Sequence, residues 1–240
     1  MAAINEISEN VYRISIHVKD FDMQFNHFLI KDDEPLLYHA GMRRMFPELK
    51  DAVSKIIDPK RLKWISWSHF EVDEVGGLNE WLQVAPNAQP VCSLVGALVN
   101  LSDFSDREPK GMQKGERFET GKYRFTFHPT PHLPHGWDAG MLFEEKNKIL
   151  FCSDLFHQMG DVEPIISSDD IIERTNNAMV GFQSGPLMDY VPYTANTKRL
   201  LNELAEFKPE KLAVMHGSSF EGDGAQLLKE LDGVFKSTFG

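Results

Sequence analysis

The sequence predicts an α/β (α+β) fold in which two mixed sheets pack face to face with helices on the outer faces, an αββα sandwich. Three observations predict it. A strand, helix, strand succession in the first half implies a parallel crossover, two hairpin patterns occupy the middle, and helices dominate beyond residue 168. With 240 residues, 42% of them hydrophobic, the chain can bury a full core, and we predict one domain over residues 1–240.

Strands and helices alternate in the first half of the chain. Apolar runs predict strands over residues 10–18, 26–31, 35–40, 63–68 and 88–93. Met45, Leu49 and Val53 recur at helical spacing and predict a helix over 43–57. The run after the diglycine 76–77 predicts a shorter helix that stops at Pro86. This order favours a sheet that is parallel in part.

Antiparallel hairpins are expected in the middle of the chain. Residues 117–128 and 141–153 each show two short strand patterns joined by a turn that contains Gly121 or Asn147. Helical patterns and one further strand follow, with helices over 169–182, 194–207 and 224–235 and a strand over 211–216. The hairpins predict a second mixed sheet.

Charge and cysteine content narrow the class of protein. The formal net charge of -11 argues against nucleic acid or an anionic membrane as the main partner, because phosphate groups require a basic surface. Cys92 and Cys152 lie in apolar runs and form no CxxC pair, so we expect two buried thiols. The N-terminal segment has no signal-peptide pattern and no stretch is long and apolar enough to span a membrane, so we expect a cytoplasmic location.

Four metal-type donors occur in the run SHFEVDEVGG, which are His69, Glu71, Asp73 and Glu74. If the chain stays extended beyond the strand, His69, Glu71 and Asp73 share a face. One cation would then bind His69 and Glu71, and a second would bind Asp73 and Glu74. Clustered carboxylates repel one another unless a positive charge lies among them, and a metal supplies that charge. A solvated acidic turn is the alternative interpretation of this segment taken alone.

Further donors follow other apolar runs downstream. PTPHLPHGWD contains His132 and His135, KILFCSD ends in Asp154, and KLAVMH ends in His216. Strand ends are where an α/β scaffold presents site residues, because a rigid sheet holds them and the loops leave room for a ligand. We therefore expect these donors to converge with the first four on a metal centre.

This order of donors resembles the metallo-β-lactamase superfamily over nearly the whole chain. HxExD with an adjacent donor, then HxP, then Asp after a strand, then His followed by Gly carries the resemblance, and the early strand FNHFLI also looks similar. The match is nearest to flavodiiron proteins and to their flavin-free relatives, the oxygen-binding di-iron proteins. It implies the αββα metallo-β-lactamase-like sandwich and two iron ions.

Carried over residue by residue, the resemblance assigns one iron to His69, Glu71, His132 and Asp154, and the other to Asp73, Glu74, Asp154 and His216, with Asp154 bridging. Glu74 departs from the pattern, because flavodiiron proteins have His there. HLP matches the family's HxP, so His132 is preferred, and a shift of register would place His135 at the metal instead. His39 occupies the place of an Asp that supports the site, and we expect it to support the ligands.

The donor set favours iron over zinc, because hard oxygen donors suit Fe or Mn better than a nitrogen-rich site does. The leading hypothesis is a di-iron protein, an oxidoreductase of flavodiiron type that binds or reduces dioxygen or nitric oxide. A zinc or manganese hydrolase acting on an ester, thioester or phosphodiester is the alternative, since a metal pair can also generate hydroxide. A non-catalytic oxygen sensor is a third interpretation.

Partners and mutants follow from this hypothesis. No flavin-binding segment is visible and the sequence ends at Gly240, so we expect no FMN site and a separate electron-donor protein. The resemblance also implies a head-to-tail homodimer. His157 is a candidate proton donor or gate near the metals. Asp154→Asn is predicted to lose both metals, whereas His135→Ala is predicted to keep them.

Overall fold

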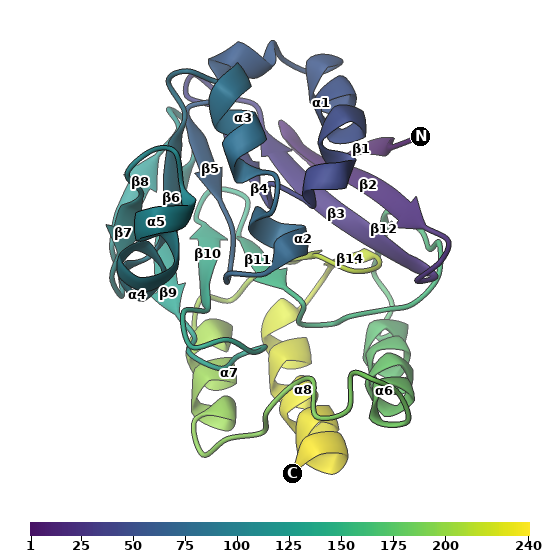
Figure 1. Ribbon diagram of the computed structural model, residues 1–240. Helices are drawn as coiled ribbons and strands as arrows, with labels where there is room; N and C mark the ends of the chain where they lie inside the picture. Colours follow the sequence, from purple (N-terminus) through teal and green to yellow (C-terminus); the bar gives the residue numbers. More distant parts are fainter.

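The computed structural model describes residues 1–240 and contains two seven-stranded mixed sheets (Figure 1). The first sheet has the order β1-β2-β3-β4-β5-β6-β7, with strands Ala3–Ser8, Val11–Val18, Met23–Ile30, Leu36–Tyr38, Trp64–Ser66, Gln89–Ser93 and Lys110–Met112. The second has the order β12-β14-β13-β11-β10-β9-β8, with strands Ile165–Ile166, Ser219–Glu221, Lys211–Val214, Ile149–Ser153, Gly140–Glu144, Arg124–Pro129 and Arg117–Glu119.

Helices lie on the two outer sides of this pair of sheets. In Figure 1, α1 and α3 lie above the strands, and α6, α7 and α8 lie below them. Their bounds are α1 Phe46–Ser54, α3 Leu78–Val84, α6 Asp170–Gln183, α7 Thr197–Ala205 and α8 Gly224–Phe239. The short helix α2 (Val72–Val75) and the segment of α4, η3 and α5 (Leu94–Phe104) complete the helical elements discussed below. The predicted αββα arrangement is confirmed.

The core has three layers that match these elements. Between the sheets, Phe151 of β11 packs against Phe28 and Tyr38 of the first sheet, with ring centroids 5.6 and 5.0 Å apart. Leu49 and Trp81 pack α1 and α3 onto the first sheet, and a third cluster joins the second sheet to α6, α7 and α8. Burial of these side chains is the main source of stability.

Most predicted elements have the predicted neighbours. Strands β4, β5, β6 and β7 pair in parallel, as the crossover in the sequence implies, and β8–β9 and β10–β11 are antiparallel hairpins. Strands β1, β7, β12 and β14 are missing from the sequence prediction: β1 is a partly exposed edge strand, and the other three are only two or three residues long. The helical segment 94–104 was also missed, because its apolar run carries no helical stop signal. Both Cys92 and Cys152 are buried, as predicted.

The strand ends position the candidate donors. Strand β5 ends at Ser66 before His69, β11 ends at Ser153 before Asp154, and β13 ends at Val214 before His216. Because β11 and β13 are parallel neighbours, their carboxyl ends lie at the same edge of the second sheet. No helix combines the length and the apolar character that crossing a bilayer requires.

Candidate metal centre

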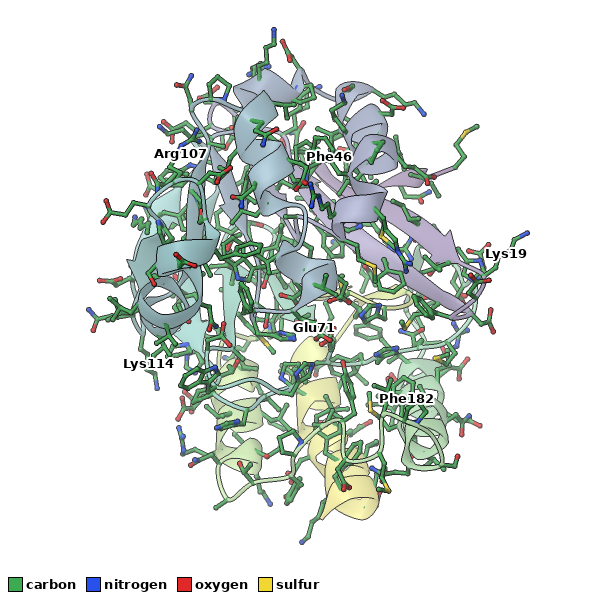
Figure 2. The ribbon with its side chains drawn as sticks, viewed as in Figure 1. Lys19, Phe46, Glu71, Arg107, Lys114 and Phe182 are labelled. Carbon is green, nitrogen blue, oxygen red and sulfur yellow. The ribbon has the colours of Figure 1, made fainter.

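Four of the predicted donors converge at this edge of the sandwich. Donor atoms of His69, Glu71, His135 and Asp154 all lie within 4.8 Å of one another, and we call these residues the first donor group. Nε2 of His69 is 2.9 Å from Oε2 of Glu71, and Nε2 of His135 is 3.1 Å from Oδ2 of Asp154. Figure 2 shows Glu71 near the middle of the molecule, between α2 and the start of α8 in this view.

Asp154 also faces a second set of donors, Asp73 and His216, which with Asp154 form the second donor group. Nε2 of His216 lies 3.3 Å from Oδ2 of Asp73 and 3.3 Å from Oδ1 of Asp154. The two oxygens of Asp154 therefore face different groups, Oδ2 the first and Oδ1 the second. This division of one carboxylate is the geometry that a bridging ligand requires.

Local backbone geometry explains which donors share a group. The chain bends at residues 68–70, where the N–H of Glu71 donates to the carbonyl of His69 at 3.0 Å, and Glu71 itself is extended, with φ of -133° and ψ of 154°. His69 and Glu71 face each other through this bend, with Nε2 and Oε2 2.9 Å apart, although the strand alternation ends before them. Helix α2 then begins at Val72. Successive helical residues are turned by about 100°, so Asp73 and Glu74 face different directions. Asp73 reaches His216, while Glu74 turns back toward the preceding segment.

Glu74 does not belong to the second donor group, contrary to the prediction from sequence. Its Oε2 accepts hydrogen bonds from the backbone N–H groups of Ser68 and His69, at 2.6 and 3.0 Å. Its Oε1 accepts from the Ser153 hydroxyl and lies 3.4 Å from Nδ1 of His69, the ring nitrogen that faces away from Glu71 and Asp154. The reason is the start of α2, which directs this side chain behind His69.

The geometry brings His135, and not the preferred His132, to the first donor group. His132 is exposed, has a positive φ of 65°, and donates its backbone N–H to the carbonyl of Gly136 at 2.7 Å. The ring of His135 instead lies 4.2 Å from the ring of His69, centroid to centroid. Leu133 is buried in the turn between them, where His132 is exposed and His135 is partly buried. The family spacing alone does not reveal this turn.

Imidazole and carboxylate groups stabilise each other's charges in the metal-free centre. Burial alone would lower the pKa of His69, but Glu74, Glu71 and Asp154 together raise it to about 10. At His216 and His135 the nearby carboxylates also outweigh burial. They raise the pKa of His216 to about 10 and the pKa of His135 to about 9. Burial would raise the pKa of Glu71, but His135 and His69 lower it to about 2.

Metal uptake is therefore expected to release protons. At pH 7 the three imidazoles of the two donor groups are protonated on both ring nitrogens, because their pKa values lie above 7. A nitrogen must lose its proton before it can bind a metal. Metal affinity should decrease as the pH decreases, since protons then compete more strongly. Titration calorimetry at pH 7 in buffers of different protonation enthalpy measures this release. A binding enthalpy that is independent of the buffer would contradict the expectation.

His39 and His157 lie beside the centre rather than in it. His39 is fully buried; its Nδ1 donates to the carbonyl of Asn26, and its Nε2 is 3.7 Å from Oε1 of Glu74. It therefore contacts the site through Glu74, which differs from direct support of a ligand.

The ring of His157 stacks on that of His216 at 4.4 Å, and burial lowers the pKa of His157 well below its usual value. His157 thus faces the second donor group as a neutral imidazole.

Two further residues at the site gave no usable sequence signal. Tyr190, in the loop after α6, lies with its ring centroid 4.8 Å from that of His135. Asp138 is buried, and its Oδ2 accepts from the backbone N–H of Phe70 and from the side chain of Asn100 at 3.0 and 3.1 Å. Asp138 thus holds the loop that carries His69 and Glu71. Tyr193 instead donates to Asp232, away from the centre.

The residues present fit a pair of cations. The two groups combine imidazoles with carboxylates and contain no thiolate, a set that suits iron, manganese or zinc. Asp73 is buried and its Oδ1 has no hydrogen-bond partner, which leaves a carboxylate oxygen free to bind a cation. Three carboxylates close together also require compensating positive charge. The donor groups would therefore hold one cation each, with Asp154 in common.

Comparisons with known proteins agree with this interpretation. The model of the family described as ODP family beta lactamase matches residues 23–217. The rubredoxin-oxygen oxidoreductase of Megalodesulfovibrio gigas is 24% identical over 200 residues, which are 82% of this chain and 49% of that protein. The flavo-diiron protein FprA2 of Clostridium acetobutylicum is 24% identical over 165 residues, 62% of this chain and 40% of that protein. The chain thus spans half or less of these relatives.

Solved structures share the fold. The flavodiiron protein from Giardia intestinalis superposes with a TM-score of 0.81 at 18% identity, over 98% of this chain and 60% of that one. The Flv1 flavodiiron core from Synechocystis sp. PCC6803 gives a TM-score of 0.82 at 18% identity, over 98% of this chain and 61% of that one. At this identity the likeness concerns the fold, and the chemistry has to be argued from the donor groups.

Proposed function

The chain belongs to the ODP family of beta lactamases, and from this membership we propose that it is a di-iron protein that binds or reduces dioxygen. The observation that carries the proposal is Asp154, whose two carboxylate oxygens face different donor groups. A shared carboxylate between two sets of imidazole and carboxylate donors suits a pair of redox-active ions. Relatives named as a rubredoxin-oxygen oxidoreductase and a flavo-diiron protein support the same choice.

In the proposed centre, His69, Glu71, His135 and Asp154 hold the first iron and Asp73, Asp154 and His216 hold the second. The iron pair would supply the electrons and the open coordination positions that dioxygen chemistry needs. The chain's own contribution is to fix the donors at strand ends and to limit access of water, since Asp154 and His69 are only 1% and 2% exposed.

Tyr190 is proposed to line the position where the small molecule binds. Burial and the negative charges of Asp154 and Glu71 raise the pKa of Tyr190 well above its usual value, so its hydroxyl keeps its proton. A protonated phenol beside His135 is a hydrogen-bond donor. Tyr190 thus provides a donor for a bound polar molecule. Nitric oxide is a second substrate that this site would accommodate.

Electrons for dioxygen reduction would come from a separate protein. The loops that carry the donors expose apolar side chains, since Phe70, Val72 and Trp137 are 38%, 62% and 55% exposed. Apolar side chains next to a site are typical of a surface that another protein covers. We propose that an electron donor, or a second copy of the chain that positions one, docks here.

Metal analysis combined with an optical spectrum before and after exposure to air tests the proposal. Protein produced with ample iron is expected to hold one iron per donor group and to change its spectrum in air. The reference sample is the same protein stripped with a chelator and reloaded with zinc, which should show no change. Stoichiometric zinc in the purified protein, with no response to oxygen and with turnover of an ester or phosphodiester, would refute it in favour of a hydrolase. A change that reverses on degassing would identify a sensor.

A further inference from the structure

We propose that Glu74 is a positioning residue that orients His69 from behind and so sets the affinity of the first donor group for its metal. The inference rests on the proposed function for the presence of a metal, but the orientation itself exists in the metal-free protein. It concerns a position at which this chain departs from the flavodiiron pattern, with Glu in place of His.

The two ring nitrogens of His69 face different surroundings. Nε2 lies 2.9 Å from Glu71 and 3.5 Å from Asp154, within the first donor group. Nδ1 lies on the opposite side, 3.4 Å from Oε1 of Glu74. The hydrogen-bond partners of Nδ1 are the hydroxyls of Ser68 and Ser153, at 3.3 and 3.5 Å, and the Ser153 hydroxyl in turn donates to Oε1 of Glu74. An acceptor at Nδ1 keeps the proton on that nitrogen and leaves Nε2 free to bind a metal.

Both carboxylate oxygens of Glu74 accept hydrogen bonds. The residue is fully buried, and its oxygens accept from two backbone N–H groups, those of Ser68 and His69, and from the hydroxyl of Ser153. Ser153 ends β11 and directly precedes Asp154. One carboxylate therefore joins the segment after β5 to the end of β11, the two segments that supply His69 and Asp154. Moving or neutralising it would disturb both.

His39 is a second histidine near Oε1 of Glu74. Its Nε2 lies 3.7 Å from Oε1 of Glu74, has no hydrogen-bond partner, and is fully buried. Its Nδ1 is fixed by the carbonyl of Asn26. The order His39, Glu74, His69 then runs from the first sheet to the donor group. The pair His39 and Glu74 reverses the residue types that the superfamily resemblance leads us to expect at these two places.

A consequence is that the two metals are bound unequally. With Glu74 behind His69, the second donor group consists of Asp73, Asp154 and His216, whereas the first has four donors. Fewer protein donors give weaker binding when the ligand types are similar. The metal of the second group should dissociate first when the loaded protein is dialysed against a chelator.

The test removes the second donor group before Glu74 is changed. In a His216→Ala background only the first group remains, and binding of Co²⁺ is followed by its visible absorption. Adding Glu74→Gln is expected to weaken Co²⁺ binding by about 10–100-fold, as loss of a partner behind a ligating histidine does. If Glu74 were a ligand of the second metal, the substitution would change nothing in this background. Unchanged affinity would therefore overturn the proposal.

Glu144→Gln in the same background is the matched control. Glu144 is also fully buried and accepts from two backbone N–H groups, those of Lys146 and Asn147, at 2.6 and 2.8 Å. It lies at the opposite end of the β10–β11 hairpin from Asp154, paired with Ile149. Removing its charge reproduces the loss of a buried carboxylate without touching His69. Co²⁺ affinity equal to that of the background is expected.

A metal-free measurement separates this inference from the proposed function. Nitrogen-15 NMR of the metal-free wild-type protein should show a hydrogen-bonded Nδ1–H signal for His69, which Glu74→Gln shifts and Glu144→Gln leaves in place. Absence of that signal in the wild-type protein would refute the role of Glu74 even if iron binds. Its presence in a protein that binds no metal would refute the di-iron proposal alone. Ser153→Ala removes a hydroxyl that is bonded both to Nδ1 and to Glu74, and should therefore shift the same signal.

Discussion

Asp154→Asn is expected to abolish binding of both metals. The carboxylate presents Oδ2 to His135 at 3.1 Å and Oδ1 to His216 at 3.3 Å, so each donor group loses an anionic oxygen at once. An amide has a single oxygen and no charge, and its nitrogen would face one of the two groups as a donor. Iron and zinc per chain, measured after loading with excess metal and desalting, should fall close to zero.

The Asp154 result can be separated from general unfolding. Glu144→Gln also neutralises a buried carboxylate in the same sheet, and it should keep full metal loading. Circular dichroism of the metal-free proteins should show the same fold for both variants. Loss of one metal with the other retained would place Asp154 in a single group, and full loading would contradict the shared carboxylate on which the proposed function depends.

The convergence of the donors was predictable because it depends on the topology of the sheets. His69, Asp154 and His216 each follow a strand with a clear apolar pattern, and the ends of such strands meet at one edge. Asp73 follows the same logic from the short helix α2 after β5. These positions required that the strands be recognised and that the two sheets be packed face to face. Periodicity in sequence carries that information.

The two departures of the geometry from the predicted site have local causes. The sequence and the family pattern place Glu74 beside Asp73 at the second metal, but α2 begins at Val72 and directs the Glu74 side chain to Ser68 and Ser153. His132 was chosen by the spacing of a family motif, but a turn that buries Leu133 brings His135 inward. Each departure concerns one or two residues of backbone conformation, which sequence patterns determine poorly. Neither changes which segments form the site.

Tyr190 illustrates what sequence could not provide. It lies in the loop after α6, a segment without periodic pattern, and reaches His135 only because that loop crosses the edge of the sandwich. Its neighbour in sequence Tyr193 bonds to Asp232 on α8 instead. Nothing in the spacing of the two tyrosines distinguishes them. Long-range packing decides which one faces the metals, and packing is not visible in a local pattern.

His135→Ala is expected to weaken binding of the metal of the first donor group until its affinity is similar to that of the second. His135 Nε2 lies 3.1 Å from Asp154 and 3.2 Å from Glu71, so its loss leaves the first group with one imidazole. The second group keeps Asp73, Asp154 and His216. The loss of affinity at the first group should exceed the roughly 10–100-fold effect of removing a partner behind a ligand. Metal titration of the variant should show two sites of similar affinity, where the wild-type protein shows one tight and one weaker site.

His132→Ala is the matched comparison, since it removes the other histidine of the same PHLPH segment. His132 is exposed, and its contact with Gly136 is made by its backbone, which the substitution retains. Loading and thermal stability should therefore equal those of the wild-type protein. If His132→Ala lost a metal and His135→Ala did not, the turn at Leu133 would have to place the opposite imidazole at the centre. The first donor group would then need His132 in place of His135.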